Sequence, residues 1–151
     1  MKYFTIQWAK GELSDKEYKK VFTNYWKNLE KIKNELPNRV YFFARNIDLH
    51  DGLFKQIKYE GNTNLEIIIT CGDIQKGYSD ILLKYTSASI IPDIFTEAFE
   101  EIQQNKIEIL SDEIDISNDI FVHRFLIYPF KEFEIYFSGL DFMKINVKDR
   151  L

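Results

Sequence analysis

The sequence has few of the residues that cross-link a chain, bend it or bind metal ions. Its 151 residues include one cysteine, Cys71, so no disulfide can form within the chain. Three prolines and six glycines are too few for a Pro/Gly-rich linker. The two histidines, His50 and His123, lie too far apart to form a metal-binding motif. No apolar run approaches the ~20 residues that a membrane-spanning helix requires. We therefore expect a cytoplasmic protein without a metal.

The glycines and the charge exclude further classes of partner. No G-x-G-x-x-G or Walker-type glycine motif occurs, so we expect no nucleotide cofactor. Lys and Arg total 20 against 24 Asp and Glu, which gives a net charge of −4 and a pI near 5.3. This balance argues against binding to nucleic acid or to an anionic membrane.

The length and the order of elements favour a single α+β domain over residues 1–151. The hydrophobic content of 45% is ordinary for a folded protein of this size. Helical and strand patterns do not alternate regularly, as they would in a parallel βαβ sheet. We therefore predict a mainly antiparallel sheet of about six to seven strands.

Two segments have helical periodicity. Ser14 and Glu17 form a capping box before a stripe of apolar residues that repeats every three or four positions, and Pro37 ends it. This pattern predicts a helix over 14–36 whose Phe22, Tyr25, Leu29 and Ile32 face the core. A second helix is predicted over 92–105. Residues 38–47 could form a helix or a strand, and residues 2–8 an edge strand or a first helical turn.

Strand patterns fill the rest of the chain. Residues 53–60 and 65–71 flank a turn at 61–64 and predict a β-hairpin. Residues 81–88 read as a third strand after a loop over 72–80. The tail suggests a meander of four strands, with strand patterns at 107–116, 120–128, 132–137 and 142–147.

The acidic residues are concentrated in one segment. Residues 1–60 have a net charge of +4 and residues 61–151 of −8, and residues 93–119 contain nine acids and one lysine. The spacing does not match a calcium-binding EF-hand, because Ile120 stands where that loop needs glycine. A solvated outer face explains the pattern, but so does a docking surface for a basic partner. The candidate docking residues are Glu108, Asp112, Glu113, Asp115 and Asp119.

A second candidate site rests on the two histidines. His50 and Asp51 precede a predicted strand, while His123 and Arg124 lie within another. If the fold brings His50, Asp51, His123 and Arg124 into one pocket, they could serve a hydrolase or a small-ligand site. Cys71 ends an apolar strand, where a buried, unreactive thiol is the ordinary case.

Short motifs at the start, middle and end of the chain resemble a family of uncharacterised bacterial proteins, a domain of unknown function. The motifs are Met1 to Thr5 with Trp8, Leu49 to Gly52, His123 to Leu126 and Glu132 to Phe137. The resemblance implies no catalytic residue or cofactor, but it draws attention to the four residues of the second candidate site. In size, acidity and aromatic content the chain also resembles bacterial toxin-immunity proteins, by analogy only.

Three functions are compatible with these patterns. We expect a non-enzymatic protein-binding module that docks a basic partner through the acidic segment. One alternative is a hydrolase or ligand-binding protein using the histidine residues. The other is a self-associating structural subunit, a homo-oligomer, suggested by 24 aromatic residues.

Overall fold

The computed structural model describes residues 1–61, 63–75, 77–92 and 107–150. Within these ranges it has three helices, α1 (Ile6–Ala9), α2 (Asp15–Ile32) and α3 (Asn38–Asn46). None of the described helices is long and apolar enough to cross a membrane. The helix predicted over 92–105 lies, apart from its first residue, outside the described residues.

The N-terminal helices follow from local signals. Ser14 accepts from the Glu17 amide and Glu17 accepts from the Ser14 amide, so the predicted capping box is confirmed as the start of α2. The helix ends at Ile32, four residues earlier than predicted, although Leu36 is still buried. Pro37 then occupies the N-cap of α3, so residues 38–46 are helical. Residues 6–9 form a short helix capped by Thr5 rather than an edge strand.

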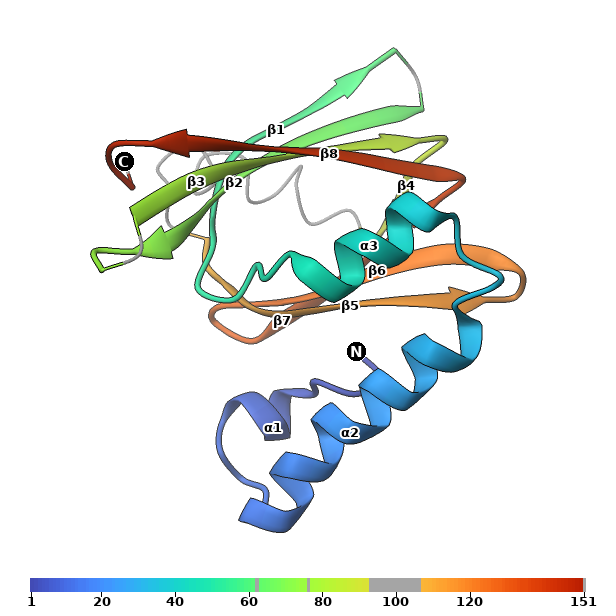
Figure 1. The fold of residues 1–151 in the computed structure, drawn as a ribbon, viewed down its shortest axis with the longest axis vertical. Helices are drawn as coiled ribbons and strands as arrows, with labels where there is room; N and C mark the ends of the chain where they lie inside the picture. The colour runs from blue at the N-terminus through green and yellow to red at the C-terminus, as the bar shows by residue number, and fades with distance from the viewer. Residues whose placement is uncertain (62, 76, 93–106, 151) are drawn as a thin grey trace.

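In the described part of the chain, eight strands form two antiparallel four-stranded sheets, drawn as two layers in Figure 1. The first sheet has the order β1-β2-β3-β8 and the second the order β4-β7-β6-β5. The strands are β1 (Leu53–Glu60), β2 (Asn64–Asp73), β3 (Gly77–Thr86), β4 (Ser89–Ile91), β5 (Ile109–Ser117), β6 (Ile120–Ile127), β7 (Lys131–Phe137) and β8 (Gly139–Val147).

The α+β class and the antiparallel pairing are confirmed, but the prediction of one sheet of six to seven strands is wrong, because the described residues form eight strands in two sheets. The β1–β2 hairpin has the predicted strands, and β3 begins four residues earlier than predicted, at Gly77. β5, β6 and β7 form a meander, whereas β8 leaves it and pairs with β3 of the other sheet. Alternation of apolar and polar residues shows which face of a sheet a side chain occupies, but it does not show which strand lies next to it. The sequence pattern therefore could not predict that β8 pairs with β3.

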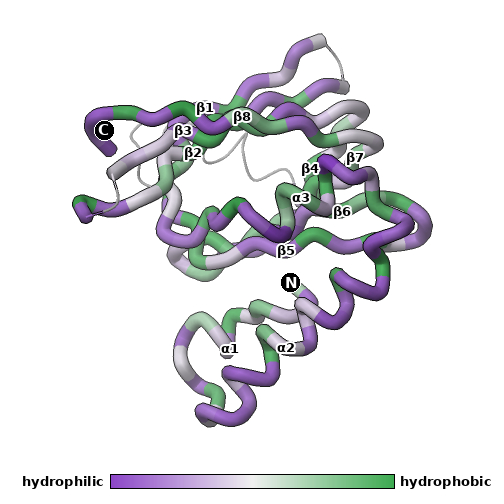
Figure 2. Tube along the Cα trace, in the orientation of Figure 1, coloured by the Kyte–Doolittle hydropathy of each residue, from purple (hydrophilic) through white to green (hydrophobic). Residues whose placement is uncertain are grey.

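The inner faces of the two sheets and one face of α3 enclose the main core. Phe43 of α3 packs against His123 of β6 and Phe142 of β8, which joins the helix to both sheets. A second, smaller cluster of Phe4, Trp8 and Tyr25 lies between α1 and α2. These two helices lie on the outer side of the second sheet (Figure 1), and α2 is largely hydrophilic along its length (Figure 2). The N-terminal helices thus form an arm beside the two-sheet body.

Candidate functional site

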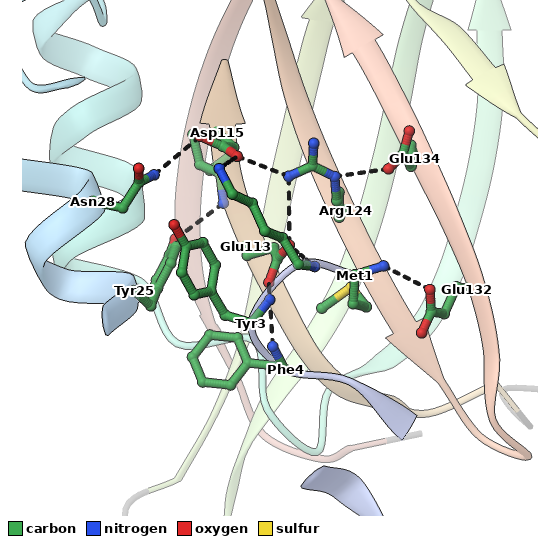
Figure 3. Close-up of polar contacts among 12 residues, drawn as sticks. Met1, Tyr3, Phe4, Tyr25, Asn28, Glu113, Asp115, Arg124, Glu132 and Glu134 are labelled. Carbon is green, nitrogen blue, oxygen red and sulfur yellow. Dashed lines mark hydrogen bonds and ion pairs between the residues drawn. The ribbon is translucent and has the colours of Figure 1, made fainter. Parts of the chain in front are cut away.

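Two acidic side chains of β5, Glu113 and Asp115, lie beneath the N-terminal segment, as Figure 3 shows. Glu113 is 0% exposed and Asp115 is also buried. Because side chains alternate along a strand, these two residues share the face toward α2 and residues 1–4, while Asp112 faces the other way. The predicted exposure of Glu113 and Asp115 is therefore wrong.

Glu113 binds the backbone of the chain's first residues. Its Oε1 accepts from the amide of Lys2 at 2.5 Å, and its Oε2 accepts from the amides of Tyr3 at 2.9 Å and Phe4 at 3.3 Å. Nη1 of Arg124 is 3.5 Å from Oε1. A buried carboxylate needs this number of donors to replace the water it has lost.

Asp115 joins the same segment to helix α2. Its carboxylate accepts from Lys2 Nζ at 2.9 Å, from Asn28 Nδ2 at 3.0 Å and from Arg124 Nη1 at 3.1 Å. Burial acts to raise the pKa of Asp115, but the hydrogen bonds from Lys2 and Asn28 outweigh burial and hold it below its ordinary value. Asp115 is therefore an internal ligand for cationic and amide groups of the arm.

Two further carboxylates complete this cluster, which we call the N-terminal clamp: Glu113, Asp115, Arg124, Glu132 and Glu134. Arg124 Nε donates to Glu134 at 2.7 Å, and the Met1 ammonium is 2.6 Å from Glu132. The Tyr25 hydroxyl accepts from the Ile114 amide at 3.0 Å, which adds a contact between α2 and β5. The clamp therefore attaches the arm to the second sheet.

The five residues of the predicted docking surface do not form one exposed patch. Glu108 precedes β5 and lies 3.9 Å from Arg150, while Asp119 is exposed in the turn after β5. Glu113 and Asp115 belong to the clamp, and Asp112 points to the opposite face of the sheet. Of the five, Glu108, Asp112 and Asp119 are not buried, and they lie at three separate places.

The second candidate site is also not assembled. His50 and Asp51 lie in the exposed loop before β1, with His50 Nδ1 2.9 Å from Asp51 Oδ1. His123 is fully buried between the sheets, whereas Arg124, its neighbour on β6, belongs to the clamp on the other face. Adjacent strand residues point to opposite faces, so one pocket cannot contain both.

His123 instead forms a buried hydrogen-bond chain with Tyr85 and Asp112. Its Nδ1 is 2.7 Å from the Tyr85 hydroxyl and its Nε2 is 2.8 Å from Asp112 Oδ2. A carboxylate only accepts, so Nε2 carries a proton and, in the neutral ring, Nδ1 accepts from Tyr85. Both ring nitrogens are thereby used, and the Asp112 carboxylate is held in a fixed orientation.

A polar cavity of about 680 Å³ opens at one end of the sandwich. Residues 46–51 form one side, and the ends of β2, β3 and β8 form the other. Its lining carries the carboxylates of Asp48, Asp51 and Asp73, together with His50 and Lys144. With a neutral histidine this lining is net negative. Within the described residues no group of three His, Cys, Asp or Glu could hold a metal ion.

Gly52 fixes how closely the 46–51 loop approaches β2. A Cβ at this position would lie 2.7 Å from Ile69 Cγ2 and 2.9 Å from Cys71 Sγ, too close for any other residue. Cys71 also lines the polar cavity, but its side chain is buried. Burial raises the pKa of the Cys71 thiol to about 12, so the thiolate needed for nucleophilic chemistry is not formed near neutral pH.

An aromatic cleft of about 430 Å³ lies between the arm and the body. The rings that line it are those of Phe4, Trp8, Tyr18, Phe22, Tyr25 and Trp26. Asp48, Asp112 and Arg45 provide its charged groups. Residues 46–48 and His50 line both spaces, so the aromatic cleft and the polar cavity adjoin along one loop.

Sequence reasoning did not find the aromatic cleft. Phe22 was predicted to face the core, but it is 36% exposed and lines the cleft, as does Tyr18 at 40%. The signal in the sequence that could have revealed the cleft was the number of aromatic residues, which we interpreted as a sign of self-association. The helical stripe did not distinguish a core from a cleft wall, because both need apolar residues at the same spacing.

Comparisons of this chain with protein-family models, with curated proteins and with solved structures found no match.

Proposed function

We propose that this protein is a cytoplasmic, non-enzymatic binding module for a basic protein partner, and that the partner docks at the polar cavity and the aromatic cleft. The proposal keeps the partner class expected from the sequence. Of the five docking residues predicted around β5 it keeps Asp112, and it moves the rest of the docking site to the loop at 46–51. A single unpaired, buried cysteine is compatible with a reducing compartment.

The proposal rests on which carboxylates have a cationic partner among the described residues and which do not. In the described part of the chain, Glu113, Asp115, Glu132 and Glu134 each have an ion pair with arginine, lysine or the terminal ammonium. Asp48 and Asp112 have no ion pair with a lysine or arginine of the described residues, although both line the cleft. Negative potential at a concave surface attracts cationic groups and speeds their encounter.

The geometry of His123 supports binding rather than catalysis by this residue. His123 is buried, and both its nitrogens have partners, so neither is available to take a proton from a ligand. Because the Cys71 thiol keeps its proton near neutral pH, this residue also offers no activated nucleophile.

One observation favours a second candidate function. The exposed His50 and Asp51 form a close pair on the lining of the polar cavity, the arrangement that orients a general base. A small-ligand or hydrolytic site there would depend on His50. Replacing His50 with Ala would abolish turnover of a panel of ester and phosphate substrates if this reading is right, and leave basic-peptide binding nearly unchanged if it is not.

The primary proposal can be tested with a hexalysine peptide, with hexaglutamate as the control peptide. We expect hexalysine to bind at low salt and to weaken as salt screens the charges over about 8 Å. Asp48→Asn with Asp112→Asn removes two cleft charges and keeps oxygen acceptors. Asp48 is exposed, so its charge contributes up to about 1 kcal/mol, and the Asp112 side chain, 17% exposed, contributes at least as much; affinity should therefore fall several-fold or more.

The matched control is Glu108→Gln with Asp119→Asn, which removes the same charge away from the cleft. It should bind hexalysine as the unmodified protein does. Equal weakening in both double variants would mean that the peptide senses only net charge, and the proposed docking site would be wrong.

A further inference from the structure

We propose that the aromatic cleft receives an arginine side chain of the basic partner, with the guanidinium stacked on the aromatic rings and paired with Asp112. This inference rests on the proposed function and names the chemical group that the partner presents. It concerns the cleft alone and not the polar cavity beside it.

Two rings of the cleft wall are exposed to solvent, Tyr18 at 40% and Phe22 at 36%, whereas Phe4, Trp8 and Tyr25 are buried behind them. Trp8 and Tyr18 are stacked, with centroids 5.3 Å apart and an interplanar angle of 10°. Phe22 meets Trp8 edge to face at 5.7 Å. The face of an aromatic ring carries negative electrostatic potential, so such a wall attracts a cation more strongly than an aliphatic wall of equal area.

The protein already holds one guanidinium against this wall. The Arg45 guanidinium carbon lies 4.8 Å from the centroid of Trp26, and Arg45 and Trp26 both line the cleft. Arg45 Nε is 3.9 Å from Glu30, so this internal arginine combines ring stacking with a nearby carboxylate. Arg45 therefore occupies the face of Trp26, and the internal pair is an example, within the cleft, of the ring-plus-carboxylate contact that we assign to the partner. The partner's guanidinium would lie against the exposed rings of Tyr18 and Phe22.

Asp112 supplies a carboxylate that is fixed before the ligand arrives. Its Oδ2 is held by His123 Nε2, which is itself held by the buried Tyr85. The Asp112 side chain is 17% exposed, and the residue lines the cleft. A rigid acceptor loses little conformational entropy on binding, and the planar fork of arginine suits carboxylate and ring together better than the point charge of lysine.

The test uses capped peptides that differ at one central residue: acetyl-KKGXGKK-amide with arginine, citrulline, lysine or norleucine at X. Citrulline keeps the shape of arginine and removes its charge. Trp8 and Trp26 are the only tryptophans in the chain, and both line the cleft, so intrinsic fluorescence reports on this site. We expect the arginine peptide to bind about tenfold more tightly than the citrulline peptide and to change the fluorescence.

Phe22→Leu tests the ring face directly, because it keeps an apolar side chain and removes the aromatic one. It should remove most of the preference for arginine over citrulline. Phe42→Leu is the matched control, since Phe42 is an exposed aromatic residue of α3 that stacks on Phe142 outside the cleft. Urea unfolding of both variants verifies that they fold.

The outcomes separate this inference from the proposed function. If all four peptides bind equally and Asp48→Asn with Asp112→Asn weakens them equally, a basic partner still docks but the arginine pocket is wrong. If norleucine binds best, the cleft takes an apolar side chain and the inference is also wrong. If no lysine-containing peptide binds at low salt, both proposals fail.

Discussion

Truncation of Glu113 tests whether the N-terminal clamp stabilises the fold. Glu113→Ala removes a fully buried carboxylate that accepts from the amides of Lys2, Tyr3 and Phe4 and lies near Arg124. The substitution leaves these donors without their acceptor and leaves Arg124 with fewer compensating charges.

The expected magnitude follows from the kinds of contact that are lost. A hydrogen bond to a charged group contributes about 1.5 to 3 kcal/mol, and such contributions do not add when they share one acceptor. Removing one partner of a buried ion pair costs about 3 to 5 kcal/mol. We expect the free energy of unfolding of Glu113→Ala to fall by about 3 to 5 kcal/mol in urea.

Two further variants serve as comparisons. Glu113→Gln keeps one acceptor oxygen but turns an NH₂ group toward amide donors, so its loss should be intermediate. Glu134→Ala removes a 29% exposed carboxylate that accepts from the same Arg124, and it should cost about 1.5 to 3 kcal/mol, less than Glu113→Ala. A loss below about 1 kcal/mol for Glu113→Ala, with residues 1–14 still protected from proteolysis, would refute the clamp as a source of stability.

Two other predictions concern the helix and the pH dependence. Leu29 of α2 is fully buried in the main core, so Leu29→Ala should cost about 2 to 5 kcal/mol in urea unfolding, and a loss under half a kcal/mol would contradict its core position. The folded-state pKa of Asp115 is lowered, so its contribution to stability is complete above the unfolded value of about 3.9 and is lost as pH falls through the lower folded pKa. The stability difference between the unmodified protein and Asp115→Asn should therefore be constant from pH 7 to 5 and shrink in acid; a difference unchanged at pH 2 would exclude this linkage.

Elements that depend on neighbouring residues could be predicted from the sequence. The capping box at Ser14 and Glu17 predicted the start of α2, and the burial of Tyr25, Leu29 and Ile32 confirms three of its four predicted core positions. The β5–β6 turn is also local: Asn118 and Asp119 both have positive φ, as a two-residue hairpin loop of type I′ requires. Such features depend on residues within a few positions of one another.

The faces of β5 could not be assigned from its pattern alone. Alternating acidic and apolar residues predict one solvated face, and Glu113 and Asp115 do lie together on the face away from the core. The face is covered because Lys2 and Asn28 reach Asp115 from 113 and 87 residues away along the chain. The pattern of residues within β5 cannot show that segments so distant in the sequence cover this face.

The position of β5 also explains why the cleft forms where it does. On one face of the strand, Glu113 and Asp115 hold the arm, whose rings form the aromatic wall of the cleft. On the other face, Asp112 is oriented by His123 and contributes a carboxylate to the same cleft. The alternation of side chains along β5 thus places the anchor of the aromatic wall and a charged group of the cleft on one strand. A loosened clamp would move the aromatic wall relative to Asp112, so a variant such as Glu113→Gln would alter ligand affinity at the cleft even though Glu113 does not line it.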